Sequence, residues 1–190
     1  MRLTVRLLVV FAFSVVFASA QTPSDGQHYA KGGLSFDYPK GWKLEETQGE
    51  DSTDLKLSRP DSDMLIQVFV HRGRITPEKL PDAKKGFIDP YISANMKQFV
   101  AMGATPKQAP DTSEIAGIKA EGVNISASLG GVTGAAKIYW AIVGQRVVVL
   151  TLFGPDTDTK RFASAWDLVR TTIKTEELAP AVSPSPKPSP

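Results

Sequence analysis

Apolar and polar residues alternate along the chain from residue 34 to residue 71, with the two-residue period of half-buried β-strands. Leu34, Phe36 and Tyr38 alternate with polar neighbours and predict a first strand, which ends at the Pro-Lys-Gly turn of residues 39–41. We expect three more strands, separated by a polar loop at residues 51–54 and a turn at residues 59–63, that begin near Trp42, Leu55 and Met64. The residues that line one face of the longest strand are Met64, Ile66, Val68 and Val70.

A helical period replaces this alternation over residues 77–102. Thr76 is the expected N-cap, and Pro77 is tolerated at the first helical position. The Asp-Pro pair at residues 89–90 predicts a break, so the stretch is either one broken helix or two. Gly103 is the expected stop.

The second half of the chain returns to strands, near residues 118–129, 138–142 and 147–153. Antiparallel hairpins fit the short connections between them, because a parallel crossover needs about a dozen residues or more. Asp156 or Thr157 is the expected N-cap of a final helix. Its apolar stripe consists of Phe162, Trp166, Val169 and Ile173. The sequence therefore predicts an α+β fold, an antiparallel β-sheet flanked by helices, in one domain over residues 33–176 without an internal repeat.

The N-terminal residues 1–20 are typical of a secretory signal peptide. Arg2 and Arg6 form a basic segment, residues 7–17 are apolar apart from Ser14, and the Ala-Ser-Ala of residues 18–20 predicts cleavage before Gln21. The alternative is a transmembrane anchor. An apolar helix of about twelve residues spans roughly 18 Å, however, whereas the hydrocarbon core of a bilayer is about 30 Å thick.

Two further segments lack the apolar side chains that a core requires. We expect residues 21–32 to form a flexible leader and the Pro/Ser-rich residues 177–190 to form a disordered tail. A tail of this composition could also serve as a spacer, as a ligand for a partner or as a glycan-bearing stalk.

Composition narrows the classes of function. The chain contains no cysteine, which excludes thiol nucleophiles, thiolate zinc sites and iron–sulfur clusters. Its 22 Lys and Arg residues face 20 Asp and Glu residues, and removal of the two arginines in residues 1–20 leaves 20 of each. A neutral chain without a dense basic stripe is not expected to bind nucleic acid, and no integral membrane segment is expected after signal cleavage.

Residues 33–42, with the sequence Gly-Leu-Ser-Phe-Asp-Tyr-Pro-Lys-Gly-Trp, contain a strand, a Pro-x-Gly turn and a tryptophan. This opening resembles that of the PsbP/Mog1-like superfamily, and the order of elements is similar over residues 32–174. The resemblance implies an α/β/α sandwich and a role in binding another protein, as in most members. The family has no shared catalytic motif, so the resemblance assigns no functional residue here.

The two histidines do not indicate a metal site. His28 lies in the expected leader and His71 at a strand end, and neither belongs to a His-x-x-x-His or Glu-x-x-His pair. His71 as the general base of a hydrolase is the weakest functional hypothesis, since a base also needs an oriented partner.

Other motifs have structural explanations. The acidic pairs Asp51/Asp54, Asp61/Asp63 and Asp156/Asp158 lack the ligand number of a calcium loop, and turns and helix capping account for them. The Gly-rich residues 130–134 lack the Lys-Ser/Thr of a phosphate loop and predict a hairpin turn. Asn124 is a formal glycosylation acceptor within an expected strand.

An apolar stripe in the expected helix could be either an adaptable binding face or core, and it consists of Tyr91, Met96, Phe99 and Met102. We expect no catalytic residue, no cofactor and no metal. The leading hypothesis is a non-enzymatic protein-binding or accessory module of the cell envelope, periplasmic or extracellular, whose partner is another envelope or extracellular protein. The alternatives are a carrier of a small apolar ligand held between sheet and helix, and a hydrolase.

Overall fold

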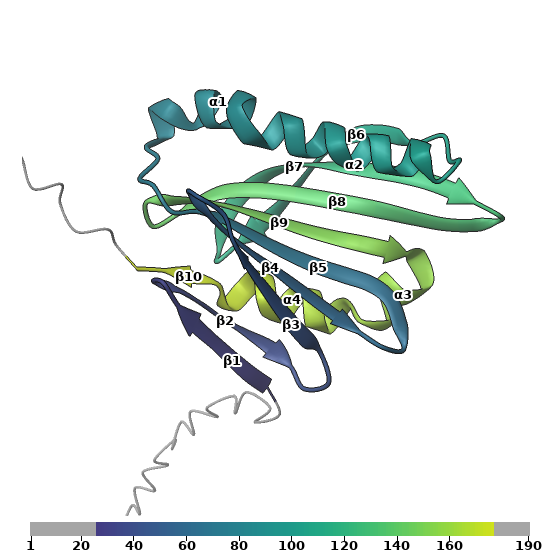
Figure 1. Cartoon of the computed structure of the whole chain (residues 1–190), viewed down its shortest axis with the longest axis horizontal. Coiled ribbons are helices and arrows are strands. Elements are labelled where there is room, and N and C mark those ends of the chain that lie inside the picture. Colours follow the sequence, from purple (N-terminus) through teal and green to yellow (C-terminus); the bar gives the residue numbers. More distant parts are fainter. Residues whose placement is uncertain (1–25, 177–190) are drawn as a thin grey trace, which may run out of the picture.

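The computed structural model describes residues 26–176, so the expected signal peptide (1–20) and tail (177–190) lie outside the described residues. Its centre is a seven-stranded sheet in the order β3-β4-β5-β9-β8-β7-β6, in which all neighbours are antiparallel (Figure 1). The strands are β3 (Lys43–Gln48), β4 (Ser52–Arg59), β5 (Ser62–His71), β6 (Lys107–Ile115), β7 (Ile118–Leu129), β8 (Val132–Val143) and β9 (Arg146–Pro155). The expected antiparallel α+β architecture is confirmed.

One face of this sheet is covered by the helical segment that follows β5. Its parts are a 3₁₀ turn (Pro77–Lys79), α1 (Leu80–Ala83), a π-turn (Lys84–Ile88) and α2 (Asp89–Ala101). The π-turn lies where a break was expected, because a wide turn directly before Pro90 relieves the clash of the proline ring with the carbonyl four residues back. Thr76 occupies the N-cap position and Pro77 follows it at the start of the helical segment, as expected, although the Thr76 side chain makes no capping hydrogen bond.

The opposite face is covered by a second helical segment and a small sheet. The elements are α3 (Asp156–Arg161), α4 (Ala163–Thr172), β1 (Gly26–Lys31), β2 (Leu34–Pro39) and β10 (Lys174–Thr175). The expected final helix is thus two short helices that meet at Phe162. Neither Asp156 nor Thr157 caps it, because the N-cap position is Pro155.

Two hydrophobic cores lie on the two faces of the central sheet. Val169 of α4 and Phe36 of β2 belong to one core, and Ile88 of the π-turn belongs to the other. Strand β9 contributes to both, with Leu150 in the first core and Val149 in the second. This double burial explains why β9 is almost entirely apolar, as expected for a central strand.

The flexible leader expected over residues 21–32 is wrong from Gly26 onward, and residues 21–25 lie outside the described residues. From Gly26 to Lys31 the chain forms strand β1, and each of its residues pairs with a residue of β2. Most of its side chains are exposed, and Tyr29 alone is half-buried, with its ring stacked 5.3 Å from that of Phe36. Backbone hydrogen bonds to β2 hold this strand in place. Because it buries few side chains, its sequence shows no alternation of apolar and polar residues.

Strand β6 was not among the expected elements either, because it too buries few side chains. It is the edge strand of the central sheet, and its side chains are largely exposed. The polar loop expected at residues 51–54 is likewise mostly strand, since β4 begins at Ser52.

Within residues 26–176, none of the helices is both long and apolar enough to cross a bilayer.

Candidate functional site

The two histidines have local structural roles. The Nδ1 atom of His28 lies 2.6 Å from a carboxylate oxygen of Asp37 across the β1–β2 pair. His71 accepts a 3.0 Å hydrogen bond at Nδ1 from the backbone N–H of Gly73, and its ring stacks 5.4 Å from that of Phe87. These contacts orient the imidazole of His71 through the backbone and a ring, and neither of them is with a carboxylate of the kind that orients a general base.

Two of the acidic pairs converge, although they are far apart in the sequence. The carboxylate of Asp158 accepts hydrogen bonds from the hydroxyl of Ser62 (2.7 Å) and the backbone N–H of Asp63 (2.9 Å). These bonds lower the pKa of the Asp158 carboxyl. Asp61 is bound by the Arg59 guanidinium at 2.5 Å, which lowers the pKa of Asp61 as well. Within residues 26–176, no group of three or more histidine or acidic residues is arranged to hold a metal ion.

The Gly-rich segment is a hairpin turn, as expected. Gly130 and Gly131 connect β7 to β8 with φ angles of 58° and 84°, the left-handed region that favours glycine. Asn124 lies within β7 and is partly buried, so its environment is that of a sheet residue.

The apolar stripe of the helix is mainly core. The hydroxyl of Tyr91 donates to Oε1 of Gln67 (2.9 Å) and also lies 2.9 Å from Oγ1 of Thr151. Phe99 is buried, with its ring 5.4 Å from that of Phe153. Only Met102, just beyond the end of α2, is largely exposed.

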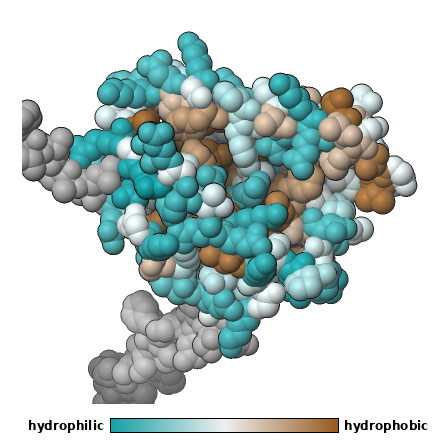
Figure 2. All heavy atoms as spheres, viewed as in Figure 1, coloured by the Kyte–Doolittle hydropathy of each residue, from teal (hydrophilic) through white to brown (hydrophobic). Residues whose placement is uncertain are grey.

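Met102 belongs to a larger exposed surface at this end of the molecule. Among the described residues, five large apolar side chains are exposed to solvent. Four of them lie at the end of α2 and at the tip of the β7–β8 hairpin. We call this set the hairpin patch; it consists of Val100, Met102, Leu129 and Val132. Figure 2 shows hydrophobic residues at the edge of the molecule where these two elements end. Exposed apolar surface of this kind is typical of binding sites.

A groove of about 360 Å³ lies beside the hairpin patch, between α2 and the sheet. Its lining is almost entirely apolar and includes Phe99, Ala127 and Phe153. Asp63 is the one charged residue that lines it. The groove is therefore suited to an apolar group without charge.

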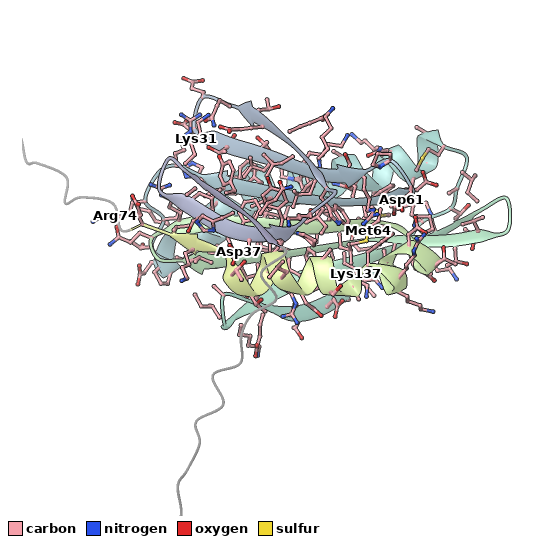
Figure 3. All side chains as sticks on the ribbon, turned by 90° about the horizontal axis from the view of Figure 1, so that it is seen from below. Lys31, Asp37, Asp61, Met64, Arg74 and Lys137 are labelled. Atoms are coloured by element: carbon pink, nitrogen blue, oxygen red, sulfur yellow. The ribbon has the colours of Figure 1, made fainter. Side chains whose placement is uncertain are left out.

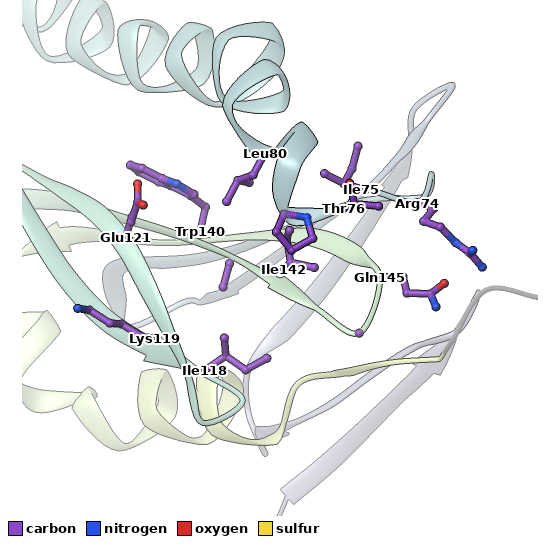
Figure 4. Close-up of a pocket in the computed structure, with 13 residues that line it drawn as sticks. Arg74, Ile75, Thr76, Leu80, Ile118, Lys119, Glu121, Trp140, Ile142 and Gln145 are labelled. Atoms are coloured by element: carbon purple, nitrogen blue, oxygen red, sulfur yellow. The ribbon is translucent and has the colours of Figure 1, made fainter.

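A larger cavity, of about 580 Å³, lies at the opposite end of the helical segment (Figure 4). We call it the Trp140 cavity. Its apolar lining includes Ile75, Leu80, Ile118, Trp140 and Ile142. Arg74, Lys119 and Glu121 contribute charged groups to its lining, and the ammonium of Lys84 lies 5.6 Å from the centre of the Trp140 ring.

A third hollow, of about 500 Å³, has a mixed polar and apolar lining and lies between β7–β8 and the α3–α4 pair. Lys137, which is labelled beside α4 in Figure 3, is one of the residues that line this hollow. The hydroxyl of Tyr139 donates a 2.7 Å hydrogen bond to Asp111. Burial and the Asp111 carboxylate raise the pKa of Tyr139 well above its usual value. Tyr139 is therefore protonated at neutral pH and cannot act there as a base.

The chain is similar to known proteins in its fold but not in its sequence. No protein-family model and no curated protein sequence matches the chain. The solution structure of cyanobacterial PsbP (CyanoP) from Synechocystis aligns with a TM-score of 0.51 and 14% identity, and the alignment covers 83% of this chain and 96% of CyanoP.

A crystal structure from Bacteroides thetaiotaomicron aligns with a TM-score of 0.50 and 14% identity, and the alignment covers 80% of this chain. It covers 49% of the Bacteroides chain, so the present chain spans about half the length of that protein. At such identities the likeness concerns the fold, and it agrees with the resemblance of residues 33–42.

Proposed function

Because the chain has a PsbP/Mog1-like fold, we propose that it is an exported, non-enzymatic binding module that docks another envelope or extracellular protein through the hairpin patch. The observation that carries this proposal is the concentration of exposed apolar side chains at one end of the molecule. Each residue of the patch is at least 41% exposed. Covering the patch would remove these side chains from water, and burying one such side chain fully contributes roughly 1.5–3 kcal/mol.

The patch also favours one kind of partner surface. Leu129 and Val132 are direct cross-strand neighbours, and they extend the apolar lining of a groove in which Asp63 is the only charged residue among those that the structure describes. An anionic partner surface would lose its hydration there without gaining an ion pair, and a cationic surface would find a single carboxylate at the edge of the groove. The partner therefore presents an apolar, uncharged surface.

The test is photocrosslinking in intact cells from a photoreactive residue at position 132 of the full chain. A partner adduct is expected, and Leu129→Glu in the same chain should abolish it because the new carboxylate would be buried against apolar groups. Ser128→Glu is the matched control. It adds the same charge to the same hairpin, but Ser128 pairs with Thr133 on the opposite face of the sheet. An adduct that survives Leu129→Glu, or the absence of any adduct, would contradict docking through this patch.

The apolar groove favours a second function, that of a carrier of a small apolar ligand between sheet and helix. Ala127 is 8% exposed and lines the groove, so Ala127→Phe would fill the groove and leave Leu129 and Val132 at its edge. Native mass spectrometry of the full chain distinguishes the two functions. A carrier would show a bound small molecule that Ala127→Phe removes, whereas a docking module would retain its partner adduct in this variant.

A further inference from the structure

The Trp140 cavity is mainly apolar, and two of its lining residues each carry a buried polar atom without a partner. Within residues 26–176, Nε1 of Trp140 and Oε1 of Gln145 are buried and lack a hydrogen-bond partner. The first atom only donates a hydrogen bond and the second only accepts one. Because both atoms are buried, the surface that the cavity offers to a ligand is mainly apolar.

The described chain ends beside this cavity. In β10, the hydroxyl of Thr175 donates a 2.6 Å hydrogen bond to the carbonyl of Val143. A side chain added at Gly144, which lines the cavity, would meet Thr175. Glu176 is then held by a 2.7 Å hydrogen bond from its N–H to the carbonyl of Gly33. Residues 177–190 therefore leave the fold next to the Trp140 cavity.

These residues have the chemistry that the cavity requires. They contain five prolines and three serines, together with Leu178 and Val182. Proline-rich segments favour the extended polyproline conformation, whose carbonyls are free to accept hydrogen bonds, and they dock on grooves lined by aromatic residues. Their proline rings and the side chains of Leu178 and Val182 suit the mainly apolar lining of the cavity.

We propose that residues 177–190 dock into the Trp140 cavity of the same chain. Fourteen residues in this conformation reach roughly 43 Å at about 3.1 Å per residue, so the segment can cross the cavity from its point of exit. The covalent link keeps the segment at an effective concentration of the order of millimolar, so a weak contact suffices for occupancy. The proposal concerns a surface distinct from the hairpin patch and is independent of the proposed function.

The absence of cysteine allows a clean test in the full chain. A nitroxide label is attached to Ser185→Cys, and the broadening of backbone amide NMR signals is measured. Signals of the cavity residues Ile118, Ile142 and Gln145 are expected to broaden. Because the tether alone keeps the label near this end of the molecule, the decisive comparison is with the same labelled chain carrying Ile118→Arg.

Ile118 is 40% exposed, so the charge should enter the cavity wall without unfolding the domain. Ile118→Arg should lose the broadening, and Ile118→Val should keep it. Leu129→Arg, a matched substitution in the hairpin patch, should also keep it. Unchanged amide positions in the cores show that each variant is folded.

If the cavity signals broaden equally with and without Ile118→Arg, the label is near the cavity only because the chain tethers it there. That result would overturn the proposal. Broadening centred on the hairpin patch would overturn it as well. A further experiment tests whether the segment docks on a second copy of the chain. Nitroxide-labelled chains without isotope label are mixed with isotope-labelled chains without nitroxide. Broadening of cavity signals in that mixture would show that the segment docks on a second copy rather than in its own chain.

Discussion

At the scale of single residues, Asp158 joins helix α3 to the β4–β5 turn, which lies far from it in the sequence. Its carboxylate accepts hydrogen bonds from Ser62 and Asp63 at the β4–β5 turn, and these bonds lower its pKa. The ordinary pKa of an aspartate is about 3.9. A carboxyl whose pKa is lower in the folded state stabilises the fold above its unfolded-state pKa, and this contribution is lost as the pH falls through the folded-state pKa.

The change Asp158→Asn should therefore lower the urea midpoint of unfolding at pH 7, because the amide replaces a charged acceptor. The difference from the natural chain should shrink as the pH falls below about 3.9, where the natural carboxyl also becomes protonated. Urea titrations of both chains at a series of pH values measure this difference. Asp82→Asn, at an exposed position of α1, controls for the loss of one charge. A difference that stays constant down to pH 2 would contradict the assignment.

At the scale of elements, the helical segment before β6 is a lid on the second core. Its π-turn ends at Ile88, which is fully buried against the sheet. The wide turn keeps the helix continuous past Pro90, so that Ile92 and Phe99 of α2 also reach this core.

Truncation of Ile88 tests this role. Ile88→Ala should reduce the free energy of unfolding by about 2–5 kcal/mol, through lost burial and the cavity left behind. Lys85→Ala, in the same turn but exposed, should change it by less than about 0.5 kcal/mol. Urea denaturation of the two variants gives both values. Similar small losses would mean that the π-turn does not seal the core.

At the scale of the whole molecule, the two cores share one sheet. Trp42 and Trp166 belong to the core beneath α4, and Trp140 belongs to the core beneath α2. Strand β9 carries side chains into both, so loss of either layer removes support from the other. The domain should therefore unfold as a single cooperative unit.

Tryptophan fluorescence can report the two cores separately. A Trp140→Phe variant reports the first core, and a Trp42→Phe/Trp166→Phe variant reports the second. Within each variant, the fluorescence midpoint should coincide with the midpoint from far-UV circular dichroism. Separate midpoints within one variant would show that the two layers unfold independently.

Elements that bury side chains were predictable from the sequence alone. The alternation from Met64 to Val70 and the apolar run of β9 follow directly from the face or faces that each strand buries. The opening at residues 33–42 indicated the fold family, because a strand, a turn and a core tryptophan are local features. Met102 was also among the residues singled out from the helical pattern.

The tertiary structure decided everything that depends on pairing or convergence. Strands β1 and β6 are held by backbone hydrogen bonds to a neighbour and leave no side-chain pattern to read. The hairpin patch unites Met102 with Leu129 and Val132 because the sheet brings the β7–β8 turn beside the end of α2. The Trp140 cavity likewise exists only where three distant segments meet. Local periodicity records which side chains are buried, whereas a site depends on which exposed side chains the fold places together, and that information is not local.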